Sequence, residues 1–220
     1  MIISAAICPH PPLIVPAVAA GAAFETDDLR AACDLAISRL LARAPEQIVI
    51  VGGDSPHAPG GLRAFAPGAP DLPDYDLPLP LVIGNWLLDR AGFAAAGRHG
   101  VVVRADGTPT DGWPGLAPTT GLLVMADGSA RRSVKGPGYL DERAEPFDAA
   151  VTKALATSDL DTLLALDSPL AAELLVGGVG PLKALAALTR GATWRAEAFY
   201  DAAPYGVQYT VASWSRIGVA

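Results

Sequence analysis

The segment that most constrains the fold is 47–52, QIVIVG, a short run of β-branched and apolar residues. Its side chains are apolar on both faces, which is typical of a strand inside a sheet that is covered on both sides. Residues 2–8 (IISAAIC) form a second apolar run, stopped by prolines. Residues 26–44 lie between the two and carry one apolar stripe at helical spacing. We therefore expect strand, helix, strand as the opening unit of an α/β fold.

The rest of the chain continues this alternation and shows no internal repeat or composition shift. A stretch at 60–80 is rich in Pro, Gly and Asp, which indicates a long loop. The closing segments alternate around a Pro-Tyr-Gly turn and predict an antiparallel pair. We expect one domain over residues 1–220, with a central mixed sheet flanked by helices on both faces. The further predicted elements are helices at 81–91, 141–157, 159–166 and 169–188 (interrupted near Gly177), and strands at 101–103, 122–126, 194–200 and 207–214.

Composition excludes several classes of function. The chain is 51% hydrophobic and has a net charge of −7, with 16 scattered basic residues, so we expect binding neither to nucleic acid nor to an anionic membrane. No stretch reaches the roughly 18 uninterrupted apolar residues of a membrane span. Prolines break the apolar N-terminus, and its first basic residue is Arg30, so it does not resemble a signal peptide. Cys8 and Cys33 lack CxxC spacing, and we expect free thiols in a cytoplasmic protein.

Two short segments resemble each other and each contains a histidine between prolines. The first predicted strand leads into CPHPP with His10, and the second leads into SPHAP with His57. Ligands of α/β sheets bind outside the carboxyl ends of the strands, where these two loops lie. Neutral imidazole is a common ligand of Zn and of non-haem Fe. The two histidines therefore either share one metal site or are separate loop residues.

These segments carry a family resemblance. IISAAICPHPPLIVP, VGGDSPHAPG, LAAELLVGGVGPLKALAAL and PYGVQYTVASW are similar, in the same order, to the class III extradiol ring-cleavage dioxygenases (catalytic subunit) and to the Memo-type proteins that share their fold. That superfamily holds iron with two histidines and one glutamate. The resemblance implies that His10, His57 and Glu173 are the metal ligands, with Fe(II) as the metal and Zn(II) as the alternative. Such a set leaves positions open for a catecholate and O₂. Considered alone, Glu173 could equally be a solvated helix residue, although its apolar neighbours argue against this.

The chain departs from the family at one point. Ring-cleaving members carry an acid/base histidine after the strand that corresponds to 122–126, whereas residues 126–132 here read ADGSARR. Asp127 could replace it as a base, and Arg131 and Arg132 could bind an anionic substrate through paired donors. The alternative is that Asp127 caps a turn and that both arginines are solvated.

Two further residues complete the candidate site. Asp54 lies three residues before His57 and could orient an imidazole, or it could be a turn residue. Tyr205 lies in the closing turn, which the resemblance places at the pocket of relatives. By composition alone that turn is an ordinary hairpin.

Three functions follow from the sequence. The first is a metal-dependent oxidoreductase that acts on a small catechol-like aromatic substrate. The second is a dioxygenase fold without catalysis, retained as a metal-binding or partner-binding protein. The third is a hydrolase in which Ser55 of Gly-Asp-Ser is the nucleophile, but no histidine after position 99 could serve as its base. Relatives often form oligomers, so a homo-oligomer is compatible with the resemblance.

Overall fold

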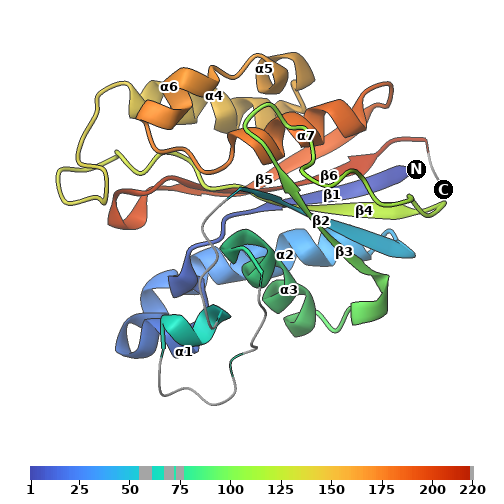
Figure 1. Ribbon diagram of the computed structural model, residues 1–220, viewed down its shortest axis with the longest axis horizontal. Coiled ribbons are helices and arrows are strands. Elements are labelled where there is room, and N and C mark those ends of the chain that lie inside the picture. Colours follow the sequence, from blue (N-terminus) through green and yellow to red (C-terminus); the bar gives the residue numbers. More distant parts are fainter. Residues whose placement is uncertain (55–60, 67–71, 73–76, 219–220) are drawn as a thin grey trace.

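The computed structural model describes residues 1–54, 61–66, 72 and 77–218, and these form a mixed β-sheet between two layers of helices (Figure 1). Within this part of the chain the sheet has six strands in the order β3-β2-β4-β1-β6-β5. The strands are β1 (Ile2–Cys8), β2 (Gln47–Gly53), β3 (Arg98–Val103), β4 (Thr120–Met125), β5 (Trp194–Ala202) and β6 (Tyr209–Arg216).

The direction of the strands decides which loops meet. β1, β2, β3 and β4 are parallel, whereas β6 runs antiparallel to β1 and β5 antiparallel to β6. The carboxyl ends of the four parallel strands therefore lie at one edge of the sheet. The turn between β5 and β6 reaches the same edge, on the left in Figure 1. This is the edge at which an α/β sheet binds its ligands.

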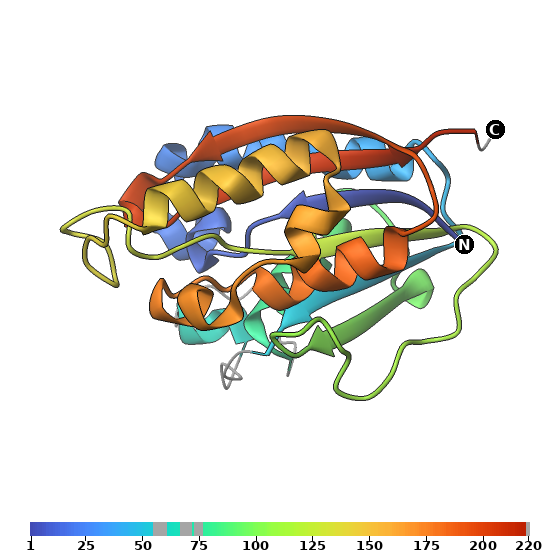
Figure 2. The same cartoon turned by 90° about the horizontal axis from the view of Figure 1, so that it is seen from above.

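The helices cover both faces of the sheet. α1, α2 and α3 lie on one face, and α4, α5, α6 and α7 lie on the other (Figure 1). On the second face α4 packs against β5, and α7 packs against β2 and β4 (Figure 2). The helices are α1 (Pro16–Ala19), α2 (Asp27–Leu41), α3 (Leu79–Arg90), α4 (Ala144–Thr157), α5 (Leu160–Leu164), α6 (Ser168–Glu173) and α7 (Val179–Thr189).

The parallel strands are apolar throughout because each face packs against a different core. In β2, Val49 and Val51 belong to the core beneath α4, α5 and α7, whereas Ile48 and Ile50 belong to the core beneath α2 and α3. All four side chains are fully buried. Burial of one such side chain contributes about 1.5–3 kcal/mol relative to exposure, so strands of this kind hold both layers in place.

The predicted α/β architecture is confirmed, with shifts of a few residues at the ends of elements. The predicted helix at 169–188 is two helices, α6 and α7, with Gly177 between them as expected. The helix predicted from 141 begins at Ala144, because the Asp141 side chain accepts the backbone N–H of Arg143 in a turn ahead of it. Among the described residues no helix has the length and apolar character that crossing a membrane requires.

Candidate functional site

His10 lies at the carboxyl edge of the sheet, two residues after β1, and is only 8% exposed. Its backbone N–H donates to Oδ1 of Asp127, at 2.7 Å. Asp127 follows β4, the neighbouring parallel strand, and the pairing of β1 with β4 brings the two residues together. The imidazole Nδ1 is buried, has no hydrogen-bond partner among the described residues and lies 3.5 Å from the same carboxylate oxygen. His10 therefore presents a buried nitrogen beside a carboxylate.

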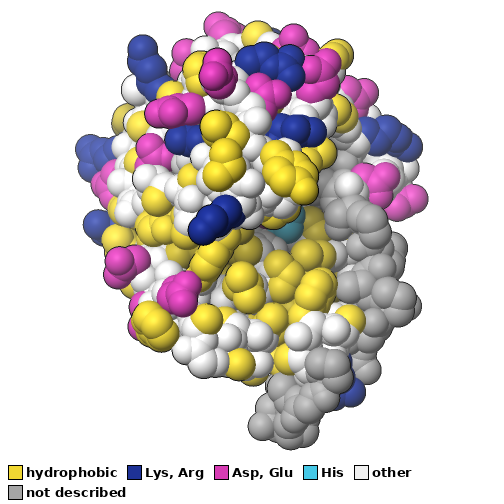
Figure 3. All heavy atoms as spheres, turned by 90° about the vertical axis from the view of Figure 1, so that its left-hand side faces the viewer, with side chains coloured by type: hydrophobic (Ala, Val, Ile, Leu, Met, Phe, Trp, Pro, Cys, Tyr) yellow, Lys and Arg dark blue, Asp and Glu magenta, His cyan; other side chains and the backbone are white. Residues whose placement is uncertain are grey.

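The other side of the imidazole faces Gly177, in the junction between α6 and α7. A Cβ built on Gly177 would lie 3.9 Å from Nε2 of His10. Gly177 also lines a cavity of about 360 Å³ at the ends of β2 and β3. Figure 3 faces this edge of the sheet and shows a histidine side chain within a hollow bordered by apolar side chains. Further residues that line the cavity include Gly53, Asp54, Arg104, Ser168 and Pro181.

The second predicted histidine, His57, lies outside the described residues. Asp54, its predicted partner, is exposed, lines the cavity and donates its backbone N–H to the carbonyl of Val103 at 3.2 Å. The roles of His57 and Asp54 therefore stay predictions.

Glu173 is the last residue of α6, and its side chain is 60% exposed. Its Oε2 accepts a hydrogen bond from Nη1 of Arg143, at 2.8 Å. The carboxylate thus faces solvent and a cation, although its neighbours in the sequence are apolar. Within the described residues no cluster of three His, Cys, Asp or Glu side chains is arranged to hold a metal. That search does not include His57, so the set of His10, His57 and Glu173 stays a prediction.

The predicted substrate-binding side chains make contacts within the protein. Nη1 of Arg131 donates to the carbonyl of Gly138, at 2.8 Å. The Tyr205 hydroxyl donates to Glu25, at 2.7 Å, and this bond raises the pKa of Tyr205. Both side chains therefore brace loops at the carboxyl edge of the sheet. Their contact with a substrate stays a prediction.

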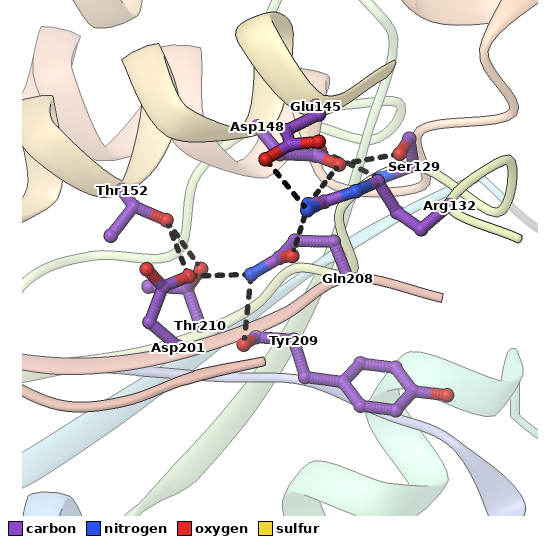
Figure 4. A network of polar contacts seen from close by, with 9 residues as sticks. All are labelled: Ser129, Arg132, Glu145, Asp148, Thr152, Asp201, Gln208, Tyr209 and Thr210. Atoms are coloured by element: carbon purple, nitrogen blue, oxygen red, sulfur yellow. Dashed lines mark hydrogen bonds and ion pairs between the residues drawn. The ribbon is translucent and has the colours of Figure 1, made fainter. Parts of the chain in front are cut away.

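Arg132 is not a solvated side chain, contrary to one of the two sequence-based alternatives, and its contact with an anion stays a prediction. Its side chain is 19% exposed, and Nη1 donates to Asp148 at 3.3 Å and to Gln208 at 2.5 Å. These contacts belong to a polar network that joins α4, the start of β6 and the loop after β4 (Figure 4). In the same network Gln208 donates to Asp201, at 2.6 Å.

Asp148 is the centre of this network, and sequence reasoning missed it. Its side chain is 2% exposed, and it accepts both the backbone N–H and the hydroxyl of Ser129, at 2.9 and 2.5 Å. A signal was available, because Asp148 occupies the buried face of α4 together with Ala144, Val151 and Leu155. An acid on an apolar helix stripe requires partners in the core.

Burial is the main cause of the raised pKa values of three groups around the site. Burial raises the pKa of Asp148 and outweighs the opposing hydrogen bonds from Ser129 and Arg132. Burial also raises the pKa of the Tyr209 phenol, and the charge of Asp127 adds to that effect. Cys8 and Cys33 are buried free thiols, as expected. Burial, followed by contact with Cys8, raises the pKa of Cys33 well above its ordinary value.

Comparison with known proteins does not identify a family: no protein-family model matches this sequence, and a search of curated proteins finds no match.

Proposed function

We propose that this protein binds a divalent metal at the carboxyl edge of its sheet and acts as a non-haem Fe(II) oxidoreductase of the extradiol dioxygenase type. The observation that carries the proposal is His10. It is an almost fully buried imidazole at the ligand-binding edge of an α/β sheet, and its Nε2 lies near Gly177, a residue that lines a cavity. Its sequence setting, CPHPP, is the most specific part of the family resemblance.

His10 and Glu173 are the described residues on which the metal proposal rests, and no group of three His, Cys, Asp or Glu side chains that could hold a metal is found among the described residues. Buried polar atoms normally have partners, and a neutral imidazole is a common metal ligand. His10 and His57 would hold the metal, with Glu173 as the carboxylate once its side chain leaves Arg143. Bound Fe(II) would supply open positions for a catecholate and O₂. A cavity of about 360 Å³ falls within the usual range for small-molecule sites.

The chain's own residues would then prepare the site. Pro9 and Pro11 flank His10 and restrict its backbone, and the Asp127 carboxylate fixes its N–H. The apolar side chains around the hollow in Figure 3 would exclude water from a bound aromatic ring.

The first test is metal content. Purified wild-type protein loaded with Fe(II) under anaerobic conditions is expected to hold one metal ion per chain, measured by mass spectrometry of the metal. His10→Ala and His57→Ala are each expected to lose it. His99→Ala is the matched control, because His99 is an exposed residue of β3, and we expect it to bind like wild type. Equal metal in wild type and in the two site variants would overturn the proposal.

A second candidate function is metal binding without catalysis. It is favoured by the sequence 126–132, which lacks a histidine, and by the internal contacts of Arg131 and Arg132. Oxygen consumption by the Fe(II)-loaded protein across a panel of catechols separates the two functions. Oxygen uptake that is lost in His10→Ala supports the oxidoreductase. The absence of oxygen uptake by protein that holds the metal supports the second candidate.

Ser55, the nucleophile of the hydrolase hypothesis, lies outside the described residues, and covalent labelling by an organophosphonate would test it.

A further inference from the structure

The carboxylate that contacts His10 comes from a distant part of the chain, and its position suggests a role other than that of a base. Asp127 is separated from His10 by 117 residues, yet its Oδ1 accepts the His10 backbone N–H at 2.7 Å and lies 3.5 Å from the imidazole Nδ1. We propose that Asp127 is the positioning residue of the metal site, holding the His10 imidazole so that Nδ1 faces the carboxylate and Nε2 faces the metal. This inference rests on the proposed function.

The geometry of the imidazole supports this division of roles. Nδ1 is buried, and Oδ1 of Asp127 lies 3.5 Å from it. Nε2 lies on the side of Gly177, and Gly177 lines the cavity in which a substrate would bind. When Nδ1 carries its proton toward a carboxylate, the lone pair of the neutral ring is on Nε2. Metal-bound histidines commonly donate their second N–H to a carboxylate in this way, which fixes the ring and its tautomer.

Asp127 is itself held by its neighbours on both sides. Before it, the N–H of Ala126 donates to the carbonyl of Cys8 at 2.9 Å, which ties the loop to the end of β1. After it, the N–H of Gly128 donates to the carbonyl of Gln208 at 2.8 Å, which ties the loop to the strand β6. Both contacts are backbone hydrogen bonds, so the backbone that carries the Asp127 carboxylate is held in place on both sides.

The buried Asp148 completes this support. It accepts two hydrogen bonds from Ser129, two residues after Asp127, and anchors the loop to α4 (Figure 4). A Cβ built on Gly128 would lie 2.9 Å from Asp148 and 2.7 Å from the Gln208 side chain, so the loop is packed closely here. The polar network therefore acts as a rigid base for Asp127, as a positioning residue requires.

Two other roles for Asp127 fit the structure less well. As a general base, Asp127 would have to use Oδ2, because Oδ1 accepts the His10 N–H. As a metal ligand, Asp127 would have its Oδ1 already engaged by the His10 N–H, and complete loss of metal binding in Asp127→Asn would reveal this role.

The test uses Asp127→Asn, which keeps an oxygen to accept the His10 backbone N–H and removes the charge. Metal-free protein is titrated with Co²⁺ alone, and the visible absorption bands of bound Co²⁺ give both the affinity and the ligand geometry. Loss of a carboxylate partner behind a histidine ligand typically weakens metal binding by about 10–100-fold. We expect Asp127→Asn to bind one Co²⁺ per chain with a dissociation constant raised by about this factor and with altered bands, while its thermal unfolding stays close to that of wild type.

Controls separate the possible failures. Asp106→Asn removes an exposed carboxylate that bonds only to Thr108 among the described residues, and it is expected to bind Co²⁺ like wild type.

Wild-type protein that binds no Co²⁺ would overturn the proposed function itself. Unchanged affinity and bands in Asp127→Asn, with wild type binding normally, would overturn only the positioning role. Complete loss of saturable binding in a folded Asp127→Asn protein would also overturn it, because Asp127 would then be a ligand. A weaker site in Asp54→Asn with a normal one in Asp127→Asn would assign the role to Asp54 instead.

Discussion

Arg143 joins two carboxylates at the surface of the candidate site. It contacts Asp141 through three hydrogen bonds and Glu173 through one, at 2.8 Å. The hydrogen bond from its side chain is the main cause that lowers the pKa of Asp141 to about 2. Glu173 would have to give up this partner to bind a metal, so in the proposed site Arg143 would compete with the metal for the same carboxylate.

The pKa of Asp141 gives a prediction about acid stability. Its folded pKa is lower than the unfolded value near 4, so its contribution to the free energy of unfolding is present above about pH 4 and is lost as pH falls toward about 2. We therefore expect Asp141→Asn to be less stable than wild type at pH 6, with the difference shrinking between about pH 4 and pH 2. Urea unfolding at several pH values measures it.

The control for this experiment is Glu142→Gln, which removes the exposed neighbouring carboxylate. We expect its stability difference from wild type to change little between pH 6 and pH 4. A difference between wild type and Asp141→Asn that widens on acidification would contradict the assignment.

At the level of single residues, sequence reasoning found groups with reactive chemistry but not their partners. His10 and Asp127 are candidates because of their residue types and their places at strand ends, whereas Glu173 is a candidate through the family resemblance. The contact of His10 with Asp127 spans 117 residues, and that of Glu173 with Arg143 spans 30. Contacts of this kind follow from strand order and helix packing, which no local pattern encodes.

At the scale of elements, the junction between α6 and α7 sets how closely the second helix layer approaches the sheet. Its glycines differ sharply in their surroundings. A Cβ on Gly180 would lie 2.3 Å from the carbonyl oxygen of Arg104, whereas a Cβ on Gly177 would have no atom closer than 3.8 Å. Gly180 thus permits α7 to begin directly against the end of β3.

This contrast predicts the effect of two matched substitutions. Gly180→Ala forces backbone to move, and we expect it to lower the free energy of unfolding by about 1–3 kcal/mol, as overpacking does. Gly177→Ala makes ordinary contacts and is expected to change stability by less than about 0.5 kcal/mol, like most benign substitutions. Chemical denaturation of both variants in metal-free form measures the difference. Equal effects from the two substitutions would mean that α7 does not depend on this close approach.

The elements themselves were largely predictable, for a physical reason. The apolar run at 47–52 and the apolar stripe in 26–44 contain residues that are buried in the structure. Because burial of apolar side chains stabilises these strands and helices, the pattern of apolar residues predicts them. The sequence does not single out Asp148, because its partners Ser129 and Arg132 lie 19 and 16 residues away in the chain. The segment with His57 lies outside the described residues, so its part in the site rests on sequence alone.

For the whole molecule, one sheet shared by two cores makes the layers mutually dependent. Trp194 and Trp214 lie in the core beneath α4, α5 and α7, with ring centroids 6.3 Å apart, whereas Trp86 packs against the core on the opposite face. Neither layer has an apolar core without the strands between them. We therefore expect both layers to unfold together.

This expectation is tested by comparing two probes during urea unfolding. Far-ultraviolet circular dichroism follows all the helices, and the fluorescence of Trp86→Phe reports mainly on the second face. The two transitions are expected to have the same midpoint. If the fluorescence change came at a clearly different urea concentration, the two layers would be independent units.

The position of β1 has a consequence for how the chain becomes folded during synthesis. β1 contains residues 2–8, and its neighbours in the sheet are β4, from Thr120, and β6, from Tyr209. This segment is therefore synthesised more than a hundred residues before either of its partners in the sheet. Contacts so distant in sequence form slowly, because a long loop must close before they stabilise anything. Until β4 and β6 emerge, the apolar IISAAIC segment has no partner strand. An exposed apolar segment of this kind is prone to aggregate, and we expect a chaperone that binds the nascent chain to bind there.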